Sequence, residues 1–154
     1  MPGFAQTGSS SAPIRRVRSE QPAIAAFIEQ GVARSETFRG LVATIDRTDG
    51  LVYVEGGKCW RSVHACLVLT VKVAGPHRLL RILVDPRRPQ RTLISSIGHE
   101  LRHAIEVLNE PSIRSNAAIF RFFSEVGPTA RETFETTAAI RAGIDICAEL
   151  GSDE

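Results

Sequence analysis

The sequence 95–112, SSIGHELRHAIEVLNEPS, decides how the rest of the chain is interpreted, because it holds two histidines four residues apart and a glutamate directly after the first. At 100° per residue, the apolar side chains around Ile97 form one stripe of an α-helix. His99 and His103 fall on the opposite face, one turn apart, with Glu100 between the two surfaces. The sequence therefore predicts a helix with an apolar side facing the core and a pair of imidazoles on its other side.

This histidine spacing predicts a zinc site. Two imidazoles at positions i and i+4 project in parallel, so each can place a nitrogen about 2 Å from one Zn²⁺ ion. Glu100 would take a proton from a metal-activated water during attack on a carbonyl group and return it to the leaving amine. The alternative is a chance HExxH on an amphipathic helix, which for a chain of this length is on the order of one in a few hundred. We expect one zinc ion as the cofactor.

A catalytic zinc ion takes three protein ligands, and the third must be a carboxylate because no histidine follows His103. Glu135 is favoured, since it heads a stripe of small and apolar residues on the last predicted helix, where a carboxylate needs a cation. Glu132 and Glu125 remain alternatives, and Glu135 is otherwise a solvated residue of a first helical turn. Glu106 shares the histidine face and is expected to orient an imidazole.

The patterns on both sides of this motif predict an α+β fold. Two N-terminal helices lead into a small three-stranded antiparallel sheet, because short connections favour antiparallel neighbours. The HExxH helix and two further helices follow the sheet. The predicted elements are helices 23–31 and 35–45, strands 51–55, 66–73 and 78–85, a helix between Pro89 and Pro111, and helices 113–126 and 130–150. All of them are assigned to one domain, 23–150.

Composition narrows the class of protein. Of the 154 residues, 43% are hydrophobic and 23% are charged, which is ordinary for a globular domain, and no apolar run is long enough for a membrane span. The net charge of +2 comes with scattered arginines, which do not indicate a nucleic-acid partner. Residues 1–22 are rich in Ser, Gly and Pro and are expected to be a disordered leader. The oligomeric state is left open.

The cysteines bear on the compartment. Cys59 and Cys66 flank a turn between two strands, so a disulfide, two free thiols and, less readily, a metal site all remain open. Cys147 is expected to be a small buried hydrophobe. Residues 1–22 do not have the pattern expected of a complete secretory signal. The protein is expected in the cytoplasm if the given start is correct, and in the periplasm or outside the cell if an upstream signal is missing and Cys59 is bridged to Cys66.

Three segments carry a resemblance to a known family. They are IGHELRHAIEVL (97–108), FRFF (120–123) and FETTAAIRAG (134–143). They resemble small uncharacterised bacterial proteins of the minimal zincin type, predicted to be zinc-dependent peptidases, and the placement is similar to the gluzincins, to which thermolysin belongs. The likeness spans about 35–150. It implies a zincin-like fold with His99, His103 and Glu135 as ligands and Glu100 as the general base.

The resemblance has one departure. Gluzincin peptidases usually bring a histidine or tyrosine from beyond the ligand glutamate to stabilise the oxyanion, and neither residue occurs after His103. The residues left as candidates are Arg114, Arg121, Arg141, Tyr53, His64 and His77. The function expected is hydrolysis of a peptide or protein substrate by a zinc metallopeptidase. The alternative is a non-proteolytic zincin-fold binding or regulatory module with a structural zinc ion.

Overall fold

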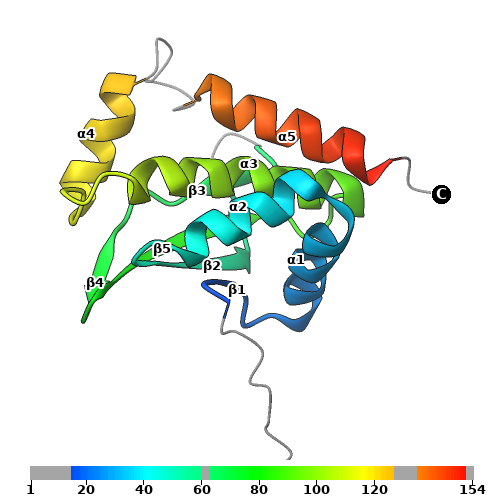
Figure 1. Ribbon diagram of the computed structural model, residues 1–154, viewed down its shortest axis with the longest axis horizontal. Coiled ribbons are helices and arrows are strands. Elements are labelled where there is room, and N and C mark those ends of the chain that lie inside the picture. Colours follow the sequence, from blue (N-terminus) through cyan, green and yellow to red (C-terminus); the bar gives the residue numbers. More distant parts are fainter. Residues whose placement is uncertain (1–14, 60–62, 127–134, 152–154) are drawn as a thin grey trace, which may run out of the picture.

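The computed structural model describes residues 15–59, 63–126 and 135–151. Within these ranges the chain forms an α+β fold with five helices and one five-stranded sheet (Figure 1). The helices are α1 (Pro22–Arg34), α2 (Glu36–Asp46), α3 (Gln90–Leu108), α4 (Asn116–Val126) and α5 (Thr137–Leu150). The strands are β1 (Val17–Arg18), β2 (Gly50–Gly56), β3 (Ala65–Leu67), β4 (Lys72–Ala74) and β5 (His77–Val84).

The sheet is mixed, which corrects the predicted three-stranded antiparallel arrangement. Its order is β1-β2-β5-β3, with β4 also paired to β5. β2 is parallel to β5, whereas β3 and β4 are antiparallel to it. Gly56 of β2 and Ala65 of β3 both pair with Val84, so the connection between them joins the two neighbours of β5 at one end of the sheet. β5 lies between β2 and β3, whereas the prediction makes these two strands adjacent.

The predicted strand 66–73 is two short strands along one edge of β5. The chain leaves the regular ladder between β3 and β4, where Val71 N–H donates to Asn116 Oδ1 at 2.9 Å. Beyond β4, Gly75 adopts a φ of +56° at the two-residue turn into β5, a conformation that glycine reaches without steric cost. The break leaves β3 as a short separate edge strand.

The end of the predicted leader is part of the sheet. Residues 1–14 lie outside the described residues, but Val17 of β1 pairs with Val52 of β2 and is buried. α1 begins at Pro22, where a proline at the first helical position costs no hydrogen bond. Ser35 caps α2 as its sequence position suggests, because its hydroxyl accepts from Phe38 N–H at 3.0 Å.

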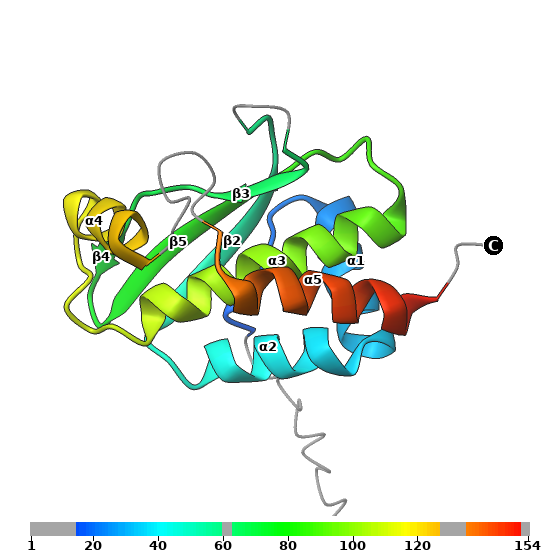
Figure 2. The same ribbon diagram turned by 90° about the horizontal axis from the view of Figure 1, so that it is seen from above.

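α3 lies between the sheet and α5, while α1 and α2 cover neighbouring parts of the same side (Figures 1 and 2). Its contact with α5 is close, because a Cβ atom added at Gly98 would lie 2.1 Å from Ile146 Cδ1. α3 is therefore enclosed on more than its apolar stripe. Glu100 and His103 are both buried, so the rest of the fold also covers the face of α3 that lies opposite the apolar stripe.

No helix in the described ranges has both the length and the apolar character needed to cross a membrane.

Candidate metal centre

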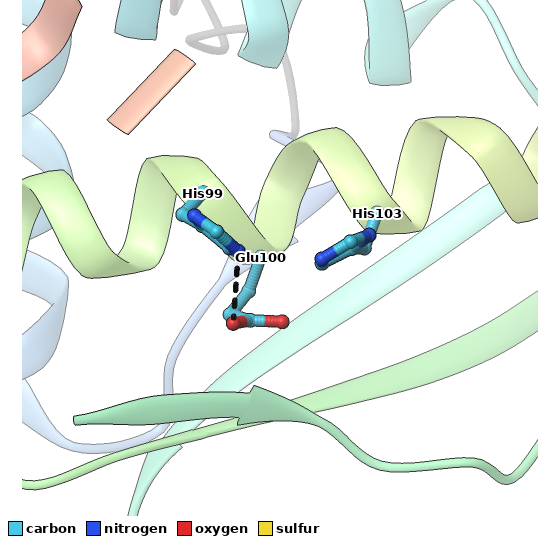
Figure 3. A group of neighbouring side chains, drawn as sticks. All are labelled: His99, Glu100 and His103. Carbon is cyan, nitrogen blue, oxygen red and sulfur yellow. Dashed lines mark ion pairs between the residues drawn. The ribbon is translucent and has the colours of Figure 1, made fainter. Parts of the chain in front are cut away.

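The two histidines and the glutamate of the motif gather on one side of α3. The ring centroids of His99 and His103 are 5.0 Å apart, and the ligand atoms of these residues and Glu100 all lie within 4.8 Å of one another (Figure 3). His103 also packs edge-on against Phe123 of α4, with 5.5 Å between ring centroids. The i, i+4 spacing on a regular helix thus brings together the residues that the sequence singled out.

Glu135 reaches this group from a distant part of the chain. Its Oε2 and Oε1 atoms lie 2.9 Å and 3.2 Å from His99 Nε2. Glu135 does not belong to α5, which begins at Thr137 with Thr136 as its N-cap, so Glu135 is not helical, in contrast to the helix predicted over 130–150. Residues 130–134 of that prediction lie outside the described residues. A residue two positions before a helix is free of helical dihedral angles, and its carboxylate can turn toward α3.

Glu106 and Thr136 form a second layer of polar groups. Glu106 Oε2 faces His103 Nδ1 at 3.5 Å, and Thr136 Oγ1 donates to Glu106 Oε1 at 2.5 Å. The Thr136 hydroxyl also accepts from Ala139 N–H, so it joins the first turn of α5 to α3. Burial alone would raise the pKa of Glu106, but its interactions with His103 and Thr136 outweigh burial and lower that pKa.

Glu100 is held at the edge of the sheet. Its Oε2 accepts a hydrogen bond from Leu67 N–H of β3 at 2.9 Å, and its Oε1 lies 3.9 Å from His99 Nε2. Burial raises the pKa of Glu100 above the ordinary value, against the opposing charges of the two histidines. Burial lowers the pKa of His99, yet the hydrogen bond that His99 donates to Glu135 and the nearby carboxylates raise it overall. Both groups therefore keep their proton to a higher pH than the free side chains do.

The hydrogen bonding of the buried polar atoms and the types of donor atom are consistent with a metal ion at this position. Buried polar atoms in folded proteins nearly always have a hydrogen-bond partner. In the described part of the chain, three of the four buried side-chain atoms without one are His103 Nδ1, Glu106 Oε2 and Glu135 Oε2. Two imidazoles and a carboxylate are a typical donor set for catalytic zinc. With Nδ1 of His103 turned to Glu106, Nε2 is the nitrogen left for a metal.

The other predicted ligands and the cysteines have different outcomes. Glu125 is exposed on α4, and Glu132 lies outside the described residues. Cys59 and Cys66 are joined by a disulfide that closes the segment leading into β3. Cys147 is a half-buried free thiol.

The candidates for oxyanion stabilisation lie in different parts of the structure, and they differ in whether they line the site. His64 lines a cleft together with His99 and Glu100. Tyr53 stacks with Arg18 instead. The remaining histidine, His77, contacts Arg16 and the carbonyl of Asp49, and Arg114, Arg121 and Arg141 are exposed.

Several residues that line this cleft were not predicted from the sequence. It has a volume of about 480 Å³, and its lining includes Val63, Ile140 and Ile144 beside the motif residues. One signal was present in the sequence: Ile140 and Ile144 are one turn apart on α5 but lie off the stripe of Ala139, Ala142, Ile146 and Leu150 that is buried. Large apolar side chains outside the buried stripe of a helix are candidates for a binding surface.

No protein-family model, curated protein or solved structure matches the chain at a significant level.

Proposed function

We propose that the chain is a zinc-dependent metallopeptidase in which His99, His103 and Glu135 hold one zinc ion and Glu100 transfers the proton. The observation that carries this proposal is the contact of Glu135 with His99, because it brings a carboxylate from the start of α5 to the HExxH helix. Glu135 Oε2 supports the proposal, since it is buried without a hydrogen-bond partner and a cation bound beside His99 would compensate its charge.

The chemistry divides between the ion and the protein. When bound, zinc polarises the scissile carbonyl and lowers the pKa of a water molecule. The raised pKa of Glu100 suits this carboxyl to accept a proton from water and to deliver it to the leaving amine. Glu106 orients His103 through Nδ1, as carboxylates commonly do for histidines that bind metals.

The edge of the sheet supports the choice of a peptide as substrate. β3 ends the strand order, so one of its edges has no neighbouring strand among the described residues. Val68 N–H donates to Arg81 of β5, and the preceding Leu67 N–H points away from β5 to Glu100. An extended peptide that pairs with this edge lies beside the general base.

Removal of the metal and of the base tests the mechanism separately. EDTA should abolish peptide hydrolysis and remove the zinc. Glu100→Gln should lower kcat/KM for a quenched fluorescent peptide by about 10²–10⁴-fold while zinc remains bound. Glu20→Gln is the matched control, because Glu20 is an exposed glutamate that precedes α1 and is not a candidate ligand, and it should cleave normally. Undiminished cleavage by the Glu100→Gln protein would refute the assigned role.

Metal analysis tests the ligand set. Purified wild-type protein should contain about one zinc per chain, as expected of a catalytic site with three protein ligands. His103→Ala and Glu135→Ala should each lose it. Zinc retained by Glu135→Ala and lost by Glu132→Ala or by Glu125→Ala would move the third ligand to that residue.

A second candidate is the non-proteolytic module with a structural zinc ion, and one observation favours it. Glu100 is buried, and one of its oxygens already accepts a hydrogen bond from the protein's own β3. A carboxylate engaged in this way joins α3 to the sheet. This candidate predicts stoichiometric zinc, no cleavage of a broad peptide library, and a large loss of stability in Glu100→Gln.

A further inference from the structure

Exposed apolar side chains gather at the cleft beside the candidate metal centre. Among the described residues, the large hydrophobic side chains that are exposed number five, and three of them line this cleft. Val63 and Ile140 are each 45% exposed, and Ile144 is 61% exposed. We call these three residues the apolar rim. The remaining two, Val73 and Phe120, are not part of the lining.

The apolar rim comes from two elements that face each other across the motif. Val63 lies two residues before β3, in the segment that the Cys59–Cys66 disulfide closes, while Ile140 and Ile144 belong to α5. His99, Glu100 and Glu135 line the same cleft, so the polar groups and the rim share one space. A ligand that reaches the motif through this cleft contacts the rim.

The chemistry of the lining selects the kind of side chain that enters. Its described residues include no lysine or arginine, and its charged groups are the carboxylates of Glu100 and Glu135. The lining therefore offers no cationic side chain to bind an acidic residue, whereas a large apolar residue would remove exposed apolar surface of the rim from water. The edge of β3, which has no neighbouring strand among the described residues, favours an extended peptide as the molecule that carries this side chain.

We propose that the cleft binds an extended peptide with a large aliphatic or aromatic side chain lodged between Val63 and Ile140–Ile144, and that the bond next to that residue is the one hydrolysed. The second part of this inference rests on the proposed function. The first part concerns binding alone and is tested without catalysis.

Binding is measured on the zinc-loaded Glu100→Gln protein, so that no probe is consumed. The probes are fluorescein-labelled octapeptides of alanine and glycine that differ only at one central residue, which is Leu, Phe, Ser or Asp. By fluorescence anisotropy, the Leu and Phe peptides should bind about tenfold or more tightly than the Ser and Asp peptides, the range that apolar pockets reach. Equal affinity for the Leu and Asp peptides would overturn the inference.

Rim variants connect the preference to these residues. Ile140→Gln and Ile144→Gln keep good helix formers on α5 and should each reduce the preference for Leu several-fold, and the double variant should remove it. Val73→Thr is the matched control, because Val73 is similarly exposed at 42% on β4 outside the cleft, and it should keep the full preference. A preference that survives in the double variant would refute the assignment.

Wild-type cleavage distinguishes this inference from the proposed function. Cleavage next to Leu and Phe that depends on the rim supports both. Cleavage that is indifferent to the central residue and to the rim variants refutes this inference and leaves the peptidase proposal standing. Rim-dependent binding with no cleavage by zinc-loaded wild type supports the binding cleft and refutes the peptidase.

Discussion

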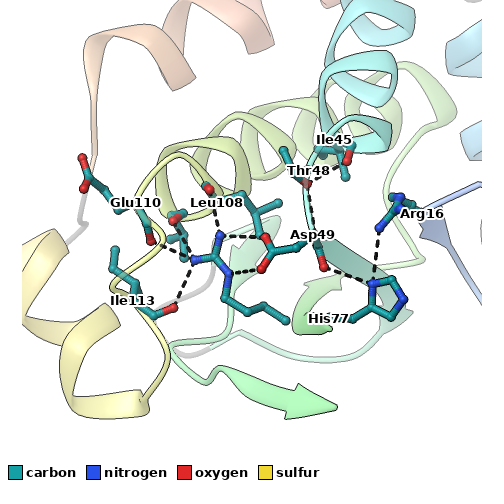
Figure 4. A network of polar contacts seen from close by, with 11 residues as sticks. Arg16, Ile45, Thr48, Asp49, His77, Leu108, Glu110 and Ile113 are labelled. Carbon is teal, nitrogen blue, oxygen red and sulfur yellow. Dashed lines mark hydrogen bonds and ion pairs between the residues drawn. The ribbon is translucent and has the colours of Figure 1, made fainter. Parts of the chain in front are cut away.

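Two buried polar clusters contact α3, and they differ in how completely their polar groups are paired. The first surrounds the guanidinium of Arg78, which is 2% exposed (Figure 4). It forms two hydrogen bonds of 2.8 Å with the carboxylate of Asp49 and donates to backbone carbonyls at the end of α3 and beyond. These acceptors are the carbonyls of Val107, Leu108, Glu110 and Ile113. The second cluster is the candidate metal centre, where three buried atoms have no hydrogen-bond partner.

This comparison distinguishes polar groups that are expected to stabilise the fold from polar groups that are expected to bind a ligand. Arg78 is the second residue of β5 and pairs with Asp49, which precedes β2, so this cluster joins the sheet to the end of α3 using groups of the protein alone. All three guanidinium nitrogens donate, as a buried charge requires. The candidate metal centre lacks such completeness, because its buried atoms without hydrogen-bond partners face only one another or a histidine of the motif. A fully paired cluster is expected to hold the fold, and an incompletely paired one to bind something.

The largest effect should follow from loss of the paired cluster. Arg78→Met removes the only donor that serves Asp49 and four carbonyls at once among the described contacts, and we expect a loss of about 3–5 kcal/mol in the free energy of unfolding. Urea denaturation measures it. The matched control is Arg81→Met, because Arg81 pairs with Glu55 on the surface, and such pairs contribute about 0–1 kcal/mol. Equal losses in the two variants would remove the contrast between the clusters.

A smaller effect should come from completion of the unpaired cluster. Zinc that binds only the folded state at 100 times its Kd raises the free energy of unfolding by about 2.7 kcal/mol. We expect this increase in thermal denaturation of the wild-type protein and not of His103→Ala. His77→Ala is the control, because His77 lies near Asp49 and away from the motif, and it should keep the response. A full zinc response in His103→Ala would exclude the assigned centre.

The smallest effect concerns acid stability of the paired cluster. The hydrogen bonds from Arg78 lower the pKa of Asp49 more than partial burial raises it. A carboxyl with a lowered pKa in the folded state contributes stability above its unfolded-state pKa and loses it as the pH falls through the folded-state value. Asp49→Asn should therefore flatten the acid limb of the stability curve measured between pH 6 and pH 2, by less than the loss in Arg78→Met because Asp49 is partly exposed. An unchanged acid limb would contradict this role.

The extent of prediction from sequence differs between local and non-local features. Ser35 as a cap, the start of α3 after Pro89 and the grouping of His99 with His103 follow from short-range rules of capping and helical period, and they agree with the structure. The parallel pairing of β2 with β5 was missed because strand order depends on which strand is inserted between two others. Connection length does not reveal that.

The candidate site shows the same division. The helical period placed Glu106 on the face of His103, and their side chains lie 3.5 Å apart. The dihedral angles that free Glu135 from α5 were not predicted, because helix starts are uncertain by a few residues. Thr136 was missed as well, although a threonine is a common N-cap, since its second role as a donor to Glu106 requires two distant segments to meet.

The sequence by itself determined the helix that carries the motif, the types of its polar groups and their spacing, since these depend on neighbours within about one helical turn. The tertiary structure decided which carboxylate approaches His99, that β3 offers its edge to Glu100, and that Val63 faces Ile140 across a cleft. These relations join segments far apart in the chain. They arise because α3 packs between the sheet and α5. The hydrophobic periodicity of a helix does not reveal that both of its sides are buried.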